Sequence, residues 1–170
     1  MKKITSIIAI ITLSIAFSAT ASAQVSASAP TSATIVTPIS IVKNTNMSFG
    51  NVAVSSTAGT VVLAPASTRT ATGGVTLPVT AGTVTAAQYT VNGQTGYTYV
   101  ITLPTTLTIT KATTLETMTL ATFTSTPSAT GTLTGGTQVV LVGATLSVGA
   151  SQVAGLYENT TGFAVTVNYN

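Results

Sequence analysis

The chain has no histidine, no cysteine, no tryptophan and no aspartate, and its 170 residues include only two acidic side chains. Without an imidazole or a thiol, there is no Ser-His or Cys-His pair for nucleophilic catalysis. A zinc or transition-metal site loses most of its usual ligands in the same way, and calcium would need several carboxylates. We therefore predict that the protein is not an enzyme and that it holds neither a metal nor another cofactor.

The two acidic residues, Glu116 and Glu158, are the remaining candidates for acid–base chemistry. They are 42 positions apart (158 minus 116), and each lies near the end of a predicted strand. Nothing in that spacing brings them together as the carboxylate pair of a glycosidase. We interpret both as ordinary solvated charges.

Charge of either sign is scarce: charged residues make up 4% of the chain, against about a quarter in an average protein. Once the N-terminal segment described below is removed, Lys43, Arg69 and Lys111 oppose two glutamates, for a net charge near +1 (three minus two). Three scattered basic residues form no phosphate-binding stripe, so nucleic acid is not an expected partner. A surface so poor in charge has little electrostatic defence against self-association, which suits a subunit of an assembly.

Residues 1–23 have the three parts of a secretory signal peptide. Lys2 and Lys3 form the basic end, residues 4–17 the apolar run, and Ala21-Ser22-Ala23 the cleavage site. Threonines and serines interrupt the run, which is shorter than the roughly 20 apolar residues of a membrane-spanning helix. We predict cleavage between Ala23 and Gln24 and export to the periplasm, the cell surface or the extracellular space, with no membrane span in the mature chain.

Residues 24–34 are rich in serine, alanine and threonine and carry no core pattern of their own. One interpretation is a flexible leader, because termini are loose unless they are tied down. The other is a donor segment that becomes a strand when another molecule supplies the partner, since Val25, Ala27 and Ala29 alternate. Residues 35–42 make a better strand, with Pro38 placing it at an edge or a bend. This segment is either the domain's own first strand or partly a neighbour's.

Threonine and valine are abundant, and both favour strands because β-branching fits a pleated surface. No window shows a convincing apolar stripe at helical spacing, whereas period-two alternation recurs along the chain. Asn92-Gly93 is a hairpin signal. The predicted strands are residues 35–42, 47–54, 60–64, 74–77, 88–91, 97–103, 106–110, 117–125, 139–142, 144–148 and 163–170. Many short strands with frequent turns predict an all-β, single-domain β-sandwich over residues 35–170.

The last predicted strand must find a neighbour, because an unpaired strand edge is a template for another chain. The same holds for the first strand if it is donated. We therefore expect two sets of side chains to make subunit contacts: Phe163, Val165, Val167 and Tyr169 in the C-terminal strand, and Ile35, Ile39 and Ile41 in the N-terminal strand or donor.

Tyr89, Tyr97 and Tyr99 could form a platform for sugars if their rings were exposed. The alternative places them in the core with their hydroxyls reaching the edge. Their strand periodicity favours the core.

Three motifs in order resemble a family of secreted bacterial proteins catalogued as domain of unknown function 4402. They are Met47-Ser48-Phe49-Gly50-Asn51-Val52, residues 142–148 (VGATLSV), and the ending Gly155-Leu156-Tyr157 followed by residues 165–169 (VTVNY). The ending is also similar to that of pilin subunits assembled by chaperones and ushers, with Tyr169 penultimate. That second resemblance implies an immunoglobulin-like β-sandwich that lacks its last strand, which an N-terminal extension of the next subunit supplies.

Together these observations predict a non-enzymatic, exported structural or adhesive surface protein, a pilin-like subunit that assembles by β-strand addition. The expected partners are other copies of the chain or a periplasmic assembly chaperone, bound through strand edges. The alternative is a monomeric secreted β-sandwich domain that binds a glycan or another surface. Exposed tyrosines beside a concavity would favour that alternative.

Overall fold

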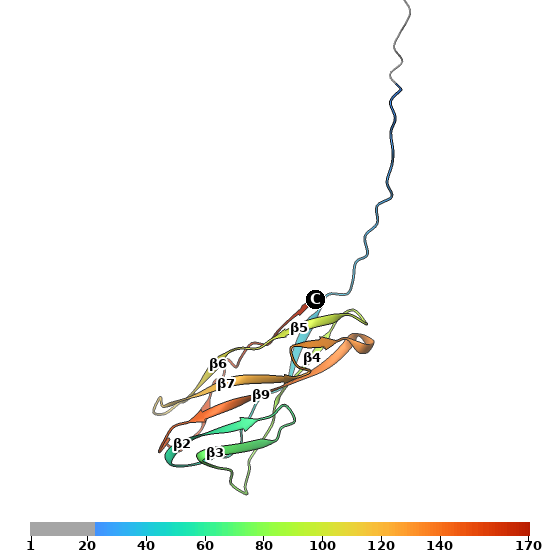
Figure 1. Cartoon of the computed structure of the whole chain (residues 1–170). Helices are drawn as coiled ribbons and strands as arrows, with labels where there is room; N and C mark the ends of the chain where they lie inside the picture. Colours follow the sequence, from blue (N-terminus) through green and yellow to red (C-terminus); the bar gives the residue numbers. More distant parts are fainter. Residues whose placement is uncertain (1–22) are drawn as a thin grey trace, which may run out of the picture. The chain divides into compact units, whose positions relative to one another are not determined.

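The structure is a computed structural model that describes residues 23–170 (Figure 1). The predicted signal peptide, apart from Ala23, lies outside the described residues. The chain divides into two compact units at Thr34 and Ile35. In the first unit, described residues 23–34 are exposed and contain neither helix nor strand. All strands lie in the second unit.

Strands dominate the described residues, which contain no α-helix and one short 3-10 turn, Thr134–Gly136. The prediction of an all-β fold is therefore confirmed for the described residues. The strands are β1 (Ser40–Thr45), β2 (Ala53–Leu63), β3 (Arg69–Thr76), β4 (Ala87–Asn92), β5 (Thr98–Thr102), β6 (Thr106–Lys111), β7 (Thr117–Thr126), β8 (Thr130–Thr132), β9 (Thr137–Val148), β10 (Tyr157–Glu158) and β11 (Thr166–Tyr169).

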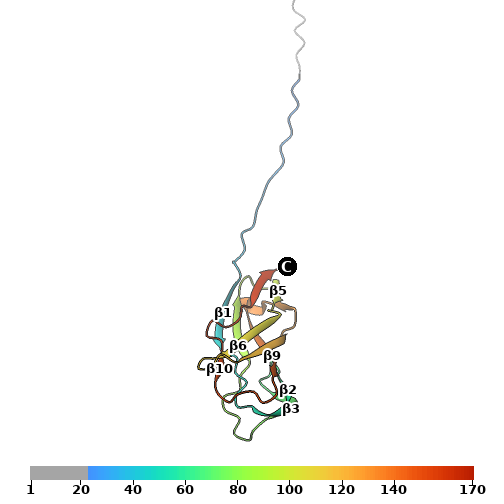
Figure 2. The same cartoon turned by 90° about the vertical axis from the view of Figure 1, so that its left-hand side faces the viewer.

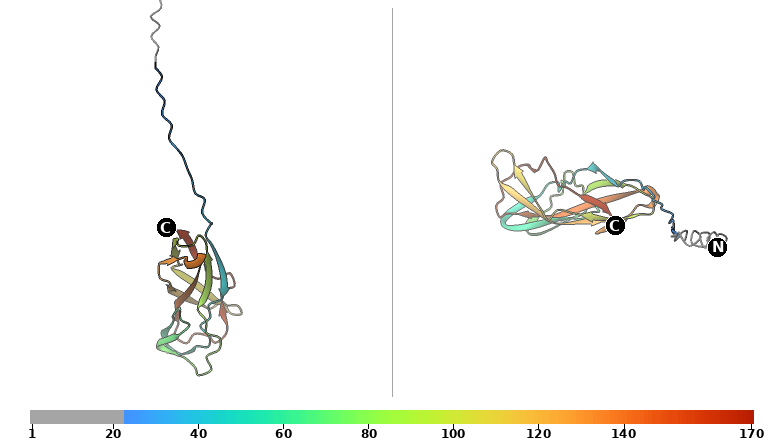
Figure 3. Two further views of the ribbon diagram at one scale, coloured as in Figure 1. Left: turned by 90° about the vertical axis from the view of Figure 1, so that its right-hand side faces the viewer. Right: turned by 90° about the horizontal axis from the view of Figure 1, so that it is seen from above.

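These strands form two antiparallel sheets. The larger has the order β1-β4-β9-β7-β6-β10, with β2 beside β9 and β3 beside β2, and the smaller has the order β11-β5-β8. The first half of β9 pairs with β4 and its second half pairs with β2, so β9 is the central strand of the larger sheet. β1 forms one edge of that sheet (Figure 3), and β11 lies beside β5 near the C-terminus (Figure 2).

Period-two alternation explains why the larger sheet has one apolar face. Val61, Leu146, Leu120 and Leu107 are direct partners across β2, β9, β7 and β6. Three of these side chains are buried, and Leu107 is half-buried. Burying a leucine or valine is worth about 1.5–3 kcal/mol, so this row is a major source of stability.

The apolar side chains form two clusters. The upper core lies where the small sheet faces the large one, and it includes Tyr89, Val91, Tyr99, Ile101 and Val167. The second cluster, which we call the lower core, contains the row formed by Val61, Leu146, Leu120 and Leu107. No strand of the small sheet belongs to it, and Met47, Phe49, Val52 and Leu77 cover it instead. The irregular segments that carry these residues set the shape of the candidate site.

Several strand predictions were wrong at the boundaries. The first strand begins at Ser40 rather than Ile35, because the Thr37 amide donates to the Gln94 side chain (3.2 Å) instead of joining a ladder. Most of residues 47–54 is irregular, with a single bridge from Ser48 to Thr85. The last strand begins at Thr166 rather than Phe163. The two predicted strands on either side of Gly143 are one continuous strand, β9, and the short β8 and β10 were not predicted.

The hairpin prediction at Asn92-Gly93 was also wrong. β4 and β5, on either side of this turn, do not pair, because they belong to different sheets. The Gly93 amide instead donates to the Gly136 carbonyl (3.0 Å). The turn therefore carries the chain from the larger sheet to the smaller one.

Candidate functional site

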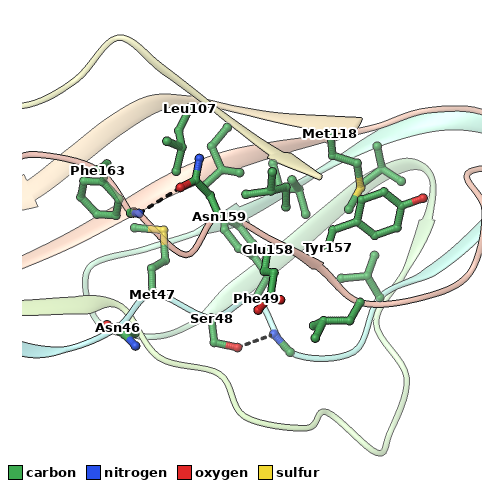
Figure 4. A pocket seen from close by; sticks show the side chains of 18 of the residues that line it. Asn46, Met47, Ser48, Phe49, Leu107, Met118, Tyr157, Glu158, Asn159 and Phe163 are labelled. Atoms are coloured by element: carbon green, nitrogen blue, oxygen red, sulfur yellow. Dashed lines mark hydrogen bonds between the residues drawn. The ribbon is translucent and has the colours of Figure 1, made fainter. Parts of the chain in front are cut away.

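The inner face of the larger sheet opens into a cavity of about 1040 Å³. Inward-facing side chains of four neighbouring strands line its sheet side, which we call the floor. The floor consists of Ala87 and Tyr89 (β4), Leu107 and Ile109 (β6), Met118 and Leu120 (β7), and Leu146 and Val148 (β9). Figure 4 shows Leu107 and Met118 on this side of the cavity and Met47 on the opposite side.

Residues 43–54, which we call the N-terminal wall, form one side of the cavity. Met47, Phe49 and Val52 pack their side chains on the lower core. Arg69 of β3 fixes this wall, because its guanidinium donates to the carbonyl oxygens of Phe49 and Asn51, the latter at 2.8 Å. Gly50 is required here: its φ is +63°, and a Cβ would collide with the Ala81 carbonyl.

Residues 152–163, which we call the C-terminal wall, form the other side. Side chains hold this segment in place. Gln152 donates to the Thr117 carbonyl (3.3 Å) and to the Tyr157 hydroxyl (2.9 Å), which in turn donates to the Val153 carbonyl (2.7 Å). Asn159 donates its side-chain amide to the Thr108 carbonyl (2.9 Å).

Backbone ladder pairing is nearly missing from the C-terminal wall. Tyr157 and Glu158 pair with β6, and Gly162 donates its backbone N–H to the Asn159 carbonyl (3.1 Å). Over the rest of residues 152–165, the described chain shows no backbone-to-backbone hydrogen bond. Most peptide groups of this wall therefore have no backbone partner within the described chain.

The predicted C-terminal contact residues divide between the cavity and the upper core. Phe163 lines the cavity and packs against Tyr89 and Phe123, with ring centroids 6.3 Å and 5.0 Å away. Val165 and Val167 are buried in the upper core. Tyr169 is half-buried and lies edge-on to Tyr97 at 5.5 Å. Of these four residues, only Phe163 lines the cavity.

The predicted N-terminal contact residues also divide. Ile39 and Ile41 are partly buried against the upper core of their own domain. Ile35, in contrast, is 97% exposed. Ala23 and Gln24, at the predicted cleavage site, are exposed and irregular. Ile39 and Ile41 thus belong to the domain's own packing, and the segment ending at Ile35 has exposed apolar side chains.

Sequence reasoning found the apolar floor residues as strand residues but missed the cavity. Alternation in residues 106–110 and 117–125 predicted which side chains face inward. It could not predict that residues 46–52 and 152–163 cover them while forming no strand longer than the two residues of β10. Tyr157 and Asn159, which hold the C-terminal wall, gave no signal beyond their place near the end of the chain.

The charged groups near the cavity are sparse. Lys43 lies on the N-terminal wall and donates to the Asn46 side chain (2.7 Å). Glu116, in the turn between β6 and β7, accepts a hydrogen bond from the Thr114 hydroxyl, which lowers the pKa of its carboxyl. Glu158 is on β10, on the other side of β6. The described residues contain no cluster of three or more carboxylates, imidazoles or thiols.

The three tyrosines considered for sugar binding have different environments. Tyr89 and Tyr99 are buried, and burial raises the pKa of both phenols. The Tyr99 hydroxyl donates to the Gln138 side chain (2.8 Å). Tyr97 is 44% exposed. The core interpretation is thus confirmed for Tyr89 and Tyr99 and is wrong for Tyr97.

Comparison with known proteins places the chain in a family. The model of the family described as "Domain of unknown function (DUF4402)" matches residues 39–169. The match spans both sheets and the cavity, and the chain belongs to this family. Neither the curated proteins nor the solved structures gave a significant match. Among the described residues, no helix has the length and apolar character needed to cross a membrane.

Proposed function

We propose that this chain is an exported, non-enzymatic structural subunit that assembles by β-strand addition. In this proposal, the segment before the domain, residues 24–35, extends from one copy into the cavity of the next copy. The observation that carries the proposal is the position of the cavity. It lies between the segment that continues the first strand and the segment that precedes the last strand.

That position is where an immunoglobulin-like sandwich would have one more strand. β5 pairs with β11, and β6, which follows β5 along the chain, pairs with β10. The β5–β11 and β6–β10 pairs therefore follow each other as one bent ladder. The first strand lies on the other side of this ladder, since β1 is also close to β11. One additional strand between the two walls would complete the second layer over the lower core.

The cavity suits a peptide strand better than a small ligand. Its volume of about 1040 Å³ slightly exceeds the roughly 300–1,000 Å³ typical of small-molecule sites. Its floor consists of apolar side chains from alternate positions, which would receive alternate side chains of an added strand. The walls supply backbone groups that such a strand can pair with.

The donor segment also supports the proposal. Residues 23–34 are exposed and irregular, and Val25 and Ile35 are 91% and 97% exposed. An eight-residue donor would extend over about 26 Å at roughly 3.3 Å per residue. The leader carries no charged side chain, so its entry into the cavity would bury no side-chain ion.

Export is part of the proposal and rests on the signal-peptide pattern of residues 1–23. Periplasm, cell surface and extracellular space are all compatible with it. An assembly chaperone could occupy the cavity before the donor does. The alternative of a monomeric glycan-binding domain has less support, because two of its three candidate tyrosines are buried.

The absence of cysteine allows a direct test by disulfide cross-linking. One copy carries Ala33→Cys in the donor, and the other carries Met118→Cys in the cavity floor. We expect a mixed disulfide dimer after oxidation. As a matched control, the second copy carries Thr102→Cys, an exposed strand position on the smaller sheet, and it should cross-link far less. Equal cross-linking to both sites would contradict docking in the cavity.

Light scattering and negative-stain microscopy then test assembly itself. The chain starting at Gln24 should form oligomers or filaments, and the chain starting at Ile35 should not. A monomer in both cases would contradict unaided self-assembly. The same samples should then be tested for glycan binding and for assembly in the presence of a periplasmic chaperone.

A further inference from the structure

The outer face of the larger sheet carries two regular rows of small, uncharged side chains. β3, β2, β9, β7 and β6 lie side by side there (Figure 1). The register aligns Thr72, Thr60, Ser147, Thr119 and Thr108 in one row. The neighbouring row is Thr70, Val62, Thr145, Ala121 and Thr106. We call these ten residues the hydroxyl face.

No charged residue belongs to the hydroxyl face, although five charged residues lie in the described chain. Directly paired residues project to the same side of an antiparallel sheet. Lys43 pairs with Tyr89 and Arg69 pairs with Leu63, and both partners are buried. These two cations therefore project to the inner side. Glu158 pairs with Thr110 at the edge of the sheet and lines the cavity, and it belongs to neither row.

Most hydroxyls of this face have no side-chain partner. Among its residues, the described structure shows one side-chain hydrogen bond, between the Thr60 and Thr72 hydroxyls (2.7 Å). Val62 is 39% exposed, and most of the threonines are exposed as well. The face thus combines free hydroxyls with methyl groups and no charge.

We propose that the hydroxyl face is a docking surface for the same face of a second copy of this chain. A partner with ordinary surface charges would have to desolvate them against a face that offers no counter-charge. A second copy presents an equally neutral surface, so no ion is buried and no like charges meet. Two-fold pairing would place this face of one copy on the same face of the other, with threonine methyls and hydroxyls on both sides of the interface. Such pairing is lateral, and it does not depend on strand addition.

The test uses the chain starting at Gln24 with Ala29→Pro and Ala33→Pro. Prolines in the exposed leader remove donors that an added strand would need, and leave the domain unchanged. Sedimentation velocity over a wide concentration range should show a monomer–dimer equilibrium. Thr119→Lys, on β7 between Ser147 and Thr108, should weaken the dimer by about tenfold or more, because each copy would bring an unpaired cation into the neutral interface.

Thr102→Lys is the matched control, since it adds the same charge at an exposed strand position on the smaller sheet. It should leave dimerisation unchanged, and Thr108→Glu should weaken it as Thr119→Lys does. Circular dichroism checks that each variant is folded. A monomer at all concentrations, or a dimer insensitive to Thr119→Lys and Thr108→Glu, would overturn the proposal. A monomer that instead binds a neutral polysaccharide would overturn it too and identify another occupant.

The two proposals fail independently. If strand addition is wrong, the leader variants still dimerise through the hydroxyl face. If lateral pairing is wrong, the proline-free chain still cross-links between Ala33→Cys and Met118→Cys, while the proline variant is monomeric.

Discussion

The Tyr169 hydroxyl donates a hydrogen bond to the Thr37 carbonyl oxygen (2.7 Å), across 132 positions of the chain. The same hydroxyl accepts a hydrogen bond from the Gln94 amide (2.6 Å), and the Gln94 side chain accepts one from the Thr37 amide (3.2 Å). One side chain from the last strand thus connects the beginning of the domain to the crossover between the two sheets. After Thr37 the chain enters the upper core, and before it lies the leader.

Tyr169→Phe should therefore lower the free energy of unfolding while leaving the aromatic contact with Tyr97 in place. Two hydrogen bonds are lost, each worth about 0.5–1.5 kcal/mol net, so we expect about 1–2 kcal/mol for this half-buried site. Urea denaturation followed by circular dichroism measures the change. Tyr97→Phe is the control, because no hydrogen bond from the Tyr97 hydroxyl occurs in the described structure. An equal loss in both variants would show that the Thr37 connection adds nothing.

Gly143 is the point where sequence reasoning divided one strand into two. A Cβ at this position would collide with the Leu63 carbonyl and lie 2.8 Å from the Ala64 carbonyl carbon. Both are backbone atoms at the end of β2, the strand paired with this part of β9, and they cannot move aside easily. We expect Gly143→Ala to cost about 2–4 kcal/mol, as overpacking of a buried backbone contact does.

Gly149→Ala is the matched control for this prediction. Its Cβ would meet the end of the Gln152 side chain, at 2.8 Å, and no backbone atom within 4 Å. Its effect should stay below about 1 kcal/mol. Thermal unfolding of the two variants side by side measures the difference, and similar melting temperatures would show that β9 and residues 63–64 can separate at low cost.

Local pattern predicted which residues form strands and which side of each strand faces inward. β6 illustrates this, because the alternation alone correctly places Leu107 and Ile109 on the inner face and Thr106 and Thr108 on the outer face. The pattern could not predict which strands pair, since pairing depends on residues far apart in the chain. Asn92-Gly93 has the composition of a hairpin turn and serves as a crossover. The cavity was missed for the same reason: residues 47–52 alternate like a strand but form a single isolated bridge, from Ser48 to Thr85.

Alkaline pH should destabilise the domain through its two buried tyrosines. Burial raises the pKa of Tyr89 and Tyr99, so the folded state holds the phenol protons more tightly than the unfolded chain does. The sign follows: their contribution is fully present below the unfolded tyrosine pKa of about 10, and it is lost as the pH rises above that value. We expect unfolding free energy to change little near neutral pH, since the chain has no histidine.

The slope of stability against pH above about pH 10 measures this effect. Tyr99→Phe should reduce the slope. Below about pH 10 it should lower the free energy of unfolding by a constant amount, because the hydrogen bond to Gln138 is lost. An unchanged slope in Tyr99→Phe would assign the alkaline loss of stability to other groups.

Substitutions at Met118 can distinguish an effect on assembly from an effect on the stability of the subunit. This residue lines the cavity floor and is half-buried, whereas its neighbour Leu120 is buried in the lower core. Leu120→Ala should cost about 2–5 kcal/mol, as large-to-small changes in a core do.

Met118→Gln should cost the free subunit only about 1 kcal/mol, because much of the side chain already faces the open cavity. If a donor strand fills the cavity, the same glutamine is buried in the assembled state without an assured partner, and oligomer formation should fall by at least tenfold, equivalent to about 1.4 kcal/mol. Met118→Leu, which conserves volume and apolar character, and Thr117→Gln, which faces outward on the same strand, should both assemble normally. Light scattering of the chain starting at Gln24 measures the outcome, and normal assembly of Met118→Gln would contradict the cavity as the acceptor.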